Sequence, residues 1–189
     1  MIECLLVVGL GNPGFEYENN RHNVGFQMIE AIAESVASSS FKGMSQVVEV
    51  SSCFYEKKKI ILAKPRTFVN LSGRAVRFLI DFYKISINKV IILHDDIDLP
   101  FGRVKIKKGG GNGGHNGLKS IDSLAGTDYW RVRIGVGRPE KKSMVVSHVL
   151  GNFSSEELEK LDAIKKVITE NLSILFSNDP KKLESLINS

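Results

Sequence analysis

The fold follows from the N-terminal stretch CLLVVGLGNPG, which spans residues 4–14. Its first five residues are apolar and partly β-branched, a composition typical of a strand buried on both faces. A glycine-rich turn follows directly and therefore lies at the carboxyl end of that strand. Because open α/β sheets bind their ligands at this edge, we expect functional residues where strands end.

Patterns typical of strands and of helices alternate along the rest of the chain. Short apolar runs predict strands at residues 47–50, 60–63 and 90–93, and the alternation of apolar residues with Arg131 and Arg133 predicts a strand with one polar face at 130–134. Helical spacing begins at Asn23, which can cap a helix, and again after Ser72, and a short helix is expected at 118–124. A capping box at Ser154 and Glu157 opens a long helix through about Phe176. The pattern predicts an α/β fold with a single domain over residues 1–189, a twisted, mostly parallel or mixed β-sheet flanked by helices on both sides.

Composition excludes several classes of protein. A chain of 189 residues can bury roughly 70% of its unfolded surface, so it needs no disulfide or metal to hold a core. Cys4 and Cys53 lie in apolar runs without metal-ligand spacing, and we interpret them as reduced packing residues of an intracellular protein. No signal-peptide pattern is present, and no apolar stretch nears the roughly 20 residues that span a bilayer. We therefore expect a cytoplasmic protein that has no membrane partner.

The net charge of +5 is concentrated in one segment of the chain. Residues 103–142 contain ten Lys or Arg against three Asp or Glu, which gives +7 there and leaves −2 for the remainder. Such a basic block is typical of phosphate binding, because neutralised phosphates release condensed counterions. A solvated charged face is the alternative.

The turn GLGNPG, residues 9–14, matches the GxGxxG pattern of nicotinamide and flavin dehydrogenases. In those proteins the glycines open the helix that holds the pyrophosphate, and an acid follows on a second strand about 20 residues on. Here Pro13 and a polar stretch delay the helix, and the acid position falls within that helix, near Glu30 or Glu34. The alternative is a tight turn that exposes the amide of Asn12 at the strand end.

A histidine, His22, lies at the expected helix start in RHNVG, residues 21–25. An imidazole with an ordinary pKa near 6.5 is available as a neutral base at cytosolic pH, and a helix N-terminus favours the neutral form. A surface or capping histidine is the alternative.

Three carboxylates follow the strand at 90–93, in HDDID at residues 94–98. One of them could accept a hydrogen bond from an imidazole nitrogen, fix its tautomer and stabilise the imidazolium that forms. They could instead hold Mg²⁺ or act as turn and capping residues, and spacing alone does not decide.

Two glycine-containing loops carry amide side chains. TFVNLSG at 67–73 contains Asn70, and GGGNGGHNG at 109–117 contains Asn112 and Asn116. An amide can donate to a developing oxyanion or to a peptide backbone without adding charge, although turn formation is the alternative. The absence of GxSxG, HExxH, P-loop and Cys–His signatures favours attack by water.

The five motifs GLGNPG, RHNVG, TFVNLSG, HDDIDLP and GGGNGGHNGL, in this order, strongly resemble bacterial peptidyl-tRNA hydrolase. RVRIGVG at 131–137 and VLG at 149–151 extend the similarity over nearly the whole chain. The resemblance implies a monomeric esterase without metal or cofactor that cleaves peptidyl-tRNA. It would recycle tRNA released with its peptide from stalled ribosomes and spare aminoacyl-tRNA.

The resemblance also implies roles by position. His22 matches the catalytic base, Asp95 matches the acid that holds it, and Asn12 matches the amide that reads the peptide bond. Asn70 and Asn116 match amides that place the substrate and the water. The positions matched to tRNA contacts are Tyr17 and Phe68 at the 3′ end and Lys107 and Arg133 at the 5′ phosphate.

Two positions depart from the family pattern, with Val69 where Met is common and Asn112 where His is common. Both bear on pocket shape and loop behaviour, since neither removes a proposed catalytic group. Two other functions remain open at this point. The basic block alone would suit a non-catalytic RNA-binding protein, and residues 9–14 would suit a dehydrogenase.

Overall fold

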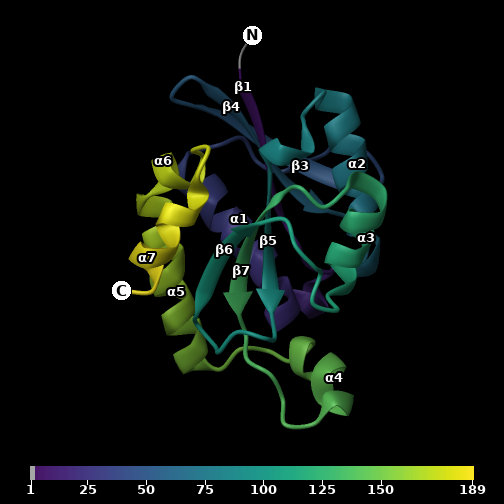
Figure 1. Ribbon diagram of the computed structural model, residues 1–189, viewed down its shortest axis with the longest axis vertical. Helices are drawn as coiled ribbons and strands as arrows, with labels where there is room; N and C mark the ends of the chain where they lie inside the picture. Colours follow the sequence, from purple (N-terminus) through teal and green to yellow (C-terminus); the bar gives the residue numbers. More distant parts are fainter. Residues whose placement is uncertain (1–2) are drawn as a thin grey trace.

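One mixed β-sheet runs through the centre of the molecule (Figure 1). The computed structural model describes residues 3–189. Its strands are β1 (Glu3–Gly9), β2 (Lys42–Gly43), β3 (Val48–Tyr55), β4 (Lys58–Pro65), β5 (Val90–Asp96), β6 (Val104–Lys108) and β7 (Trp130–Gly135). The strand order is β2-β3-β4-β1-β5-β7-β6, in which β4, β1, β5 and β7 run parallel and the outer pairs are antiparallel. The predicted α/β class is confirmed.

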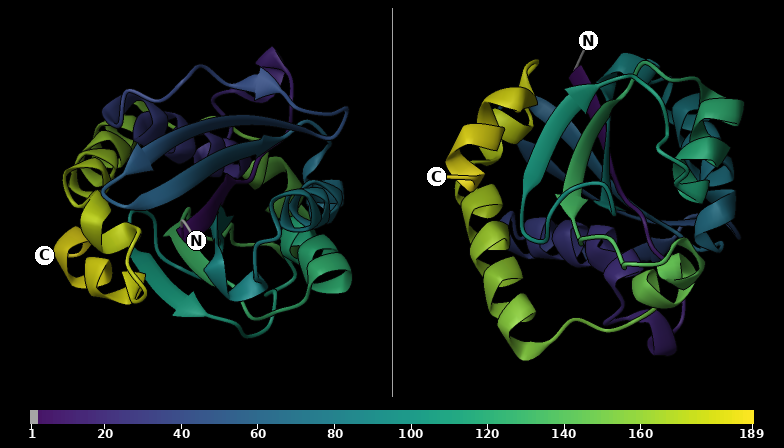
Figure 2. Two further views of the ribbon diagram at one scale, coloured as in Figure 1. Left: turned by 90° about the horizontal axis from the view of Figure 1, so that it is seen from above. Right: turned by 60° about the horizontal axis from the view of Figure 1, so that its bottom comes forward.

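Helices cover both faces of this sheet (Figures 1 and 2). They are α1 (Val24–Ser35), α2 (Ser72–Tyr83), α3 (Asn116–Ala125), α4 (Val145–Val149), α5 (Ser155–Glu170), α6 (Leu172–Leu175) and α7 (Leu183–Ile187). Leu5 and Val7 of β1 pack in a core with α1, α5, α6 and α7, whereas Leu6 and Val8 pack with α2 and α3. This alternation is what a strand buried on both faces requires. None of the helices among the described residues combines the length and apolar character needed to cross a bilayer.

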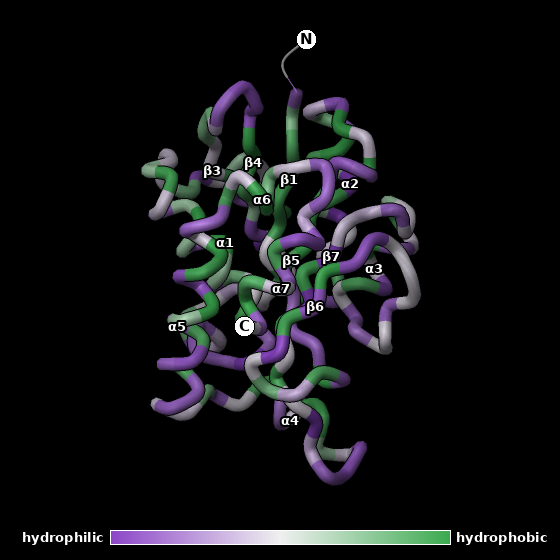
Figure 3. Tube along the Cα trace, turned by 60° about the vertical axis from the view of Figure 1, so that its left-hand side comes forward, coloured by the Kyte–Doolittle hydropathy of each residue, from purple (hydrophilic) through white to green (hydrophobic). Residues whose placement is uncertain are grey.

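The capping box is present, but the helix that it opens is shorter than predicted. Ser154 accepts from the backbone N–H of Glu157, and the Glu157 carboxylate accepts from the N–H of Ser154. Figure 3 shows hydrophobic and hydrophilic segments alternating along α5, as expected for an amphipathic helix. The helix ends at Glu170. The side chain of Asn171 donates to the Val167 carbonyl at 2.8 Å and so takes the acceptor that the backbone N–H of Asn171 would use in a continuing helix.

Three elements, the two-residue strand β2, β6 and α4, were not predicted from the sequence. Val104 and Ile106 alternate with basic residues in β6, a period-2 signal hidden in the basic block. β6 is also an edge strand, and the C-terminal segment covers it. The side chains of Asn188 and Glu184 accept from the N–H groups of Val104 and Ile106 at 3.0 and 2.8 Å. The C-terminal segment with α7 therefore protects this edge of the sheet.

Candidate active site

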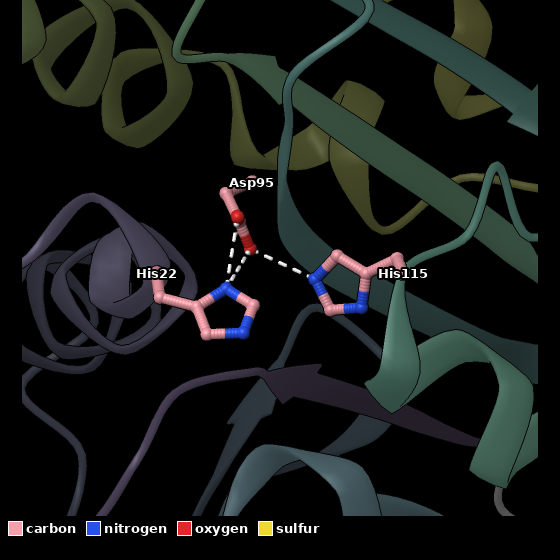
Figure 4. Close-up of side chains that lie close together, drawn as sticks. All are labelled: His22, Asp95 and His115. Carbon is pink, nitrogen blue, oxygen red and sulfur yellow. Dashed lines mark hydrogen bonds and ion pairs between the residues drawn. The ribbon is translucent and has the colours of Figure 1, made fainter. Parts of the chain in front are cut away.

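His22 and Asp95 lie side by side although 73 positions separate them in the chain (Figure 4). The Nδ1 atom of His22 is 2.9 Å from both carboxylate oxygens of Asp95. Asp95 lies within β5 and is 2% exposed, and His22 lies in a 3₁₀ turn before α1. A carboxylate at Nδ1 requires the proton on that nitrogen. Neutral His22 therefore carries its lone pair on Nε2, which bonds to no residue within 3–189.

Two glycines, Gly9 and Gly25, allow His22 to approach Asp95 this closely. A Cβ atom on Gly25 would lie 2.3 Å from the carbonyl oxygen of Leu93, and one on Gly9 would lie 2.2 Å from the carbonyl oxygen of Gly25. The first turn of α1 thus packs directly against the ends of β1 and β5, which brings His22 to Asp95. Any side chain at either glycine would push the helix away.

Residues at the start of α1 pack against the GLGNPG turn, and this packing leaves no room for a dinucleotide. A Cβ on Gly11 would lie 2.8 Å from the ring of Phe26. The amide of Asn23 both accepts from the N–H and donates to the carbonyl of Asn12, each at 2.9 Å. A pyrophosphate would need these backbone groups and this space. The same contacts correct the capping prediction, because Asn23 precedes α1 but makes no side-chain capping bond.

The side chain of Asn12 is held in one orientation. Its Oδ1 atom accepts the backbone N–H of Val69 at 2.8 Å, and the residue is 7% exposed. No residue within 3–189 accepts from its Nδ2 group, and Asn12 lines the cleft described below. Asn12 therefore presents a hydrogen-bond donor, suited to a carbonyl oxygen.

A third residue, His115, joins the pair, and no role for it was inferred from the sequence. Its Nε2 atom is 2.8 Å from Oδ1 of Asp95 (Figure 4). Its Nδ1 atom accepts the backbone N–H groups of Gly117 and Leu118 at 3.1 and 3.3 Å, which caps α3. Because Nδ1 is an acceptor, the proton of neutral His115 is on Nε2 and is donated to Asp95. The available signal was a histidine in a glycine-rich loop that precedes an expected helix, but only the fold reveals its partner.

His22, Asp95 and His115 each offer one ligand atom, all within 4.8 Å of one another. A metal on Nε2 of His115 would leave the proton of a neutral ring on Nδ1, facing two backbone N–H donors. Metal-bound histidines instead donate their second N–H to an acceptor. The hydrogen bonds around His115 therefore oppose metal binding.

The three HDDID carboxylates are likewise engaged by protein groups, which leaves the Mg²⁺ interpretation without support. Asp96 pairs with Arg133, and Asp98 pairs with Arg138. Asp95 is held by two imidazoles. A hard cation would have to displace these partners to gain the oxygen ligands that it prefers.

Burial and charge set the protonation of the cluster. Burial acts to lower the pKa of His22, but the charge and hydrogen bond of Asp95 outweigh it and raise that pKa above 6.5. The helix-start argument alone therefore gave the wrong direction. Burial opposes ionisation of Asp95, yet His22 and His115 hold its pKa well below the usual range. Burial, followed by the nearby His115, lowers the pKa of His94 to about 3, so His94 is neutral.

A cleft of about 720 Å³ opens over this cluster. The sequence-predicted residues that line it are Asn12, Tyr17, His22, Phe68, Asn70, Asp95 and Asn116. The rings of Tyr17 and Phe68 meet edge to face, with centroids 6.1 Å apart. Apolar side chains of α4, including Val145 and Val149, form another part of the wall. The cleft therefore combines a polar centre with apolar flanks, as ligand sites commonly do.

Lys107 and Arg133 lie on the neighbouring strands β6 and β7, outside the lining of the cleft. Lys107 is paired with Arg131 in the register of these strands, two positions from Arg133, and burial, followed by the charge of Arg133, lowers the pKa of Lys107. Arg133 Nε donates to Asp96 at 2.8 Å, and Asp96 does line the cleft.

The basic block presents less free charge than its composition predicts. Arg131 is fully buried, and ion pairs engage Lys108, Arg133 and Arg138. Within residues 3–189, the cations of this block without an ion-pair partner are Arg103, Lys105, Lys107, Lys119, Lys141 and Lys142. The count of +7 therefore overstates the charge available to a polyanion.

A sequence profile described as "Peptidyl-tRNA hydrolase" matches residues 6–189. The chain belongs to the peptidyl-tRNA hydrolase family. A peptidyl-tRNA hydrolase of Bartonella henselae is 47% identical over 174 residues, covering 92% of this chain and 90% of the relative. One of Rickettsia peacockii is 47% identical over 184 residues, covering 97% and 100%. The crystal structure of peptidyl-tRNA hydrolase from Acinetobacter baumannii matches with a TM-score of 0.92 at 34% identity, covering 100% of this chain and 96% of that one.

Membership in the peptidyl-tRNA hydrolase family makes the chain an enzyme, and the structure locates its two departures from the family pattern. Val69 is 6% exposed, and its backbone N–H donates to the side chain of Asn12. Any residue except proline would provide that N–H. Asn112 lines the cleft, and its amide donates to Asp122 at 3.3 Å. Neither departure alters the contacts among His22, Asp95 and His115.

Proposed function

We propose that this chain hydrolyses the ester bond between the peptide and the tRNA of peptidyl-tRNA, with His22 as general base. The observation that carries the proposal is the contact of His22 Nδ1 with buried, ionised Asp95 at 2.9 Å. That contact leaves Nε2 as the acceptor for a proton from water. Family membership supplies the substrate class.

In the proposed reaction, Nε2 of His22 takes a proton from a water molecule whose oxygen attacks the ester carbonyl carbon. Asp95 stabilises the imidazolium. The tetrahedral intermediate then collapses, and the bond between the carbonyl carbon and the ribose oxygen breaks. The imidazolium returns the proton to that oxygen, which yields free tRNA and a peptide with a new carboxyl group.

Amide side chains would position the substrate around this centre. The Nδ2 group of Asn12, whose Oδ1 is fixed by Val69, would donate to the carbonyl of the peptide bond next to the ester. An aminoacyl-tRNA lacks that carbonyl, which would explain its exclusion. Asn70 and Asn116 line the same cleft and would place the substrate, the water or the oxyanion.

The tRNA part of the substrate would meet two regions. Tyr17 and Phe68 offer aromatic surface in the cleft for the 3′ end. Lys107 and Arg133 would bind the 5′ phosphate, where Arg133 must share its guanidinium with Asp96. We further propose that the enzyme acts as a cytoplasmic monomer, recycles tRNA released from stalled ribosomes and needs no metal.

The test is release of labelled N-acetyl-aminoacyl groups from tRNA in the presence of EDTA, with unblocked aminoacyl-tRNA as the control substrate. His22→Ala should lower kcat by about 10² to 10⁴ or more, because general-base assistance is lost. His148→Gln is the matched control: His148 bonds the Val136 carbonyl outside the cleft lining, and glutamine can keep that bond. Tight tRNA binding without turnover by folded wild type would favour a non-catalytic RNA-binding protein.

A further inference from the structure

The loop that carries His115 is rich in glycine and needs support from outside itself. Residues 109–115 lie between β6 and α3, and four glycines there have positive φ: Gly109, Gly110, Gly113 and Gly114. Glycine restricts the backbone least, so ordering such a loop costs more conformational entropy than ordering other segments. A stable hydrogen bond from His115 to Asp95 therefore requires groups that fix the loop.

Arg131 of β7 reaches the loop from the sheet and bonds to its backbone. It is 0% exposed, and its two terminal nitrogens donate to the carbonyl oxygens of Gly110 and Gly111, both at 2.6 Å. Its guanidinium carbon lies 4.6 Å from the centre of the Tyr129 ring. A planar guanidinium can bridge two successive carbonyls, whereas an ammonium group cannot reproduce that geometry.

Asp122 of α3 extends these contacts to the far part of the loop. Its carboxylate accepts from Arg131 at 3.3 Å, from the Tyr129 hydroxyl at 2.7 Å and from the Asn112 amide at 3.3 Å. The carbonyl of Asn112 in turn accepts the backbone N–H of His115 at 3.0 Å. Arg131 is thus linked through Asp122 and Asn112 to the backbone of His115.

We propose that Arg131 is a positioning residue that fixes the glycine loop so that His115 donates to Asp95 while His22 remains the base. It acts through hydrogen bonds and touches neither substrate nor reacting atoms. The kinetic part of this inference rests on the proposed function, whereas its effect on the protonation of His22 does not.

The protonation of His22 reports on the loop for an electrostatic reason. The ionisable groups that face His22 are Asp95 and His115, while the neighbouring Arg21 is paired with Glu157 at 2.9 Å. A hydrogen bond from Nε2–H of His115 occupies one oxygen of Asp95, spreads the charge of the carboxylate and weakens its hold on a proton at His22. When the loop loosens, that bond is lost and the pKa of His22 rises.

The experiment follows His22 by NMR titration in Arg131→Lys, Arg131→Met and His115→Ala, together with kcat and KM for N-acetyl-aminoacyl-tRNA. Arg131→Lys is decisive because it keeps the positive charge and removes the bridge to both carbonyls. Leu175→Ala, in the core on the other face of the sheet, is the control for lowered stability. We expect the His22 inflection to move to higher pH in all three site variants and to stay unchanged in Leu175→Ala.

The kinetic expectation is a kcat lowered about 10- to 100-fold in both Arg131 variants, with KM within about threefold of wild type. A shift in Arg131→Met without one in Arg131→Lys would mean that charge acts alone, which would overturn the positioning role. An unchanged titration in both variants would overturn it as well. The expected titrations without cleavage by wild type would contradict the proposed function and uphold the role of Arg131.

Discussion

The cluster of His22, Asp95 and His115 and the cationic pair Lys107 and Arg133 are neighbours that are built differently. The cluster is buried and directional: the side chain of Asp95 is 2% exposed, and the two imidazoles donate to it. The cationic pair lies near the surface, where Arg133 is 20% exposed and bound to Asp96. Buried hydrogen bonds depend on which atom carries the proton, whereas exposed charges act through a field that salt screens. Substitutions in the two regions should therefore have different effects, on kcat and its pH dependence in the cluster and on salt-dependent tRNA binding at the cationic pair.

Among the variants that compare these two regions, Asp95→Asn should have the largest effect, with kcat lowered by about 10² to 10⁴. With the amide oxygen in the place of Oδ1, where it accepts from His115, the amide NH₂ takes the place of Oδ2, 2.9 Å from Nδ1 of His22, and two N–H donors would face each other there. His115 cannot move its proton from Nε2 to Nδ1, because Nδ1 already accepts two backbone N–H groups. His22 must therefore accept from the new amide through Nδ1 and carry its proton on Nε2, where it cannot act as base. Steady-state cleavage of N-acetyl-aminoacyl-tRNA, with folding checked by circular dichroism, tests this, and near-wild-type kcat would refute the tautomer argument.

A smaller effect is expected for His115→Ala, about tenfold in kcat. Its signature is in the pH profile. The base must be neutral, so activity rises with pH through the pKa of His22, which Asp95 already holds above 6.5. Loss of the second donor on Asp95 raises that pKa further, and the acidic limb of the profile should move to higher pH. His115→Gln, which can still donate, should restore part of the shift, and a limb that moves to lower pH would contradict the proposed arrangement.

The smallest effect on catalysis is expected for Lys107→Ala. It should leave kcat unchanged, raise the Kd for tRNA several-fold and reduce the slope of log K against log salt by about 1. Binding is measured by fluorescence anisotropy at several salt concentrations. Lys57→Ala, in the exposed turn between β3 and β4, is the matched loss of one charge and should change neither quantity. Equal losses in both variants would mean that Lys107 contributes only net charge.

Prediction from the sequence succeeded where a signal is local. The apolar run of β1, the helical spacing of α2 and the capping box of α5 all depend on residues a few positions apart. Prediction was weakest where basic residues interrupt a pattern, as in β6, or where an amide side chain has a distant partner. Asn23 illustrates the latter, since its amide bonds Asn12 rather than capping α1.

The sequence by itself determined the α/β class, the turn at the end of β1 and the residue types available for acid–base chemistry, because strand, turn and helix preferences act over short spans. Only the tertiary structure decided the tautomer of His115, the burial of Arg131 and the distance from His22 to Asp95. Those features depend on the close packing of α1 at Gly9 and Gly25 and on contacts between residues far apart in the chain. The protonation state of a side chain, and the position of its proton, depend on the partners that the completed fold places around it.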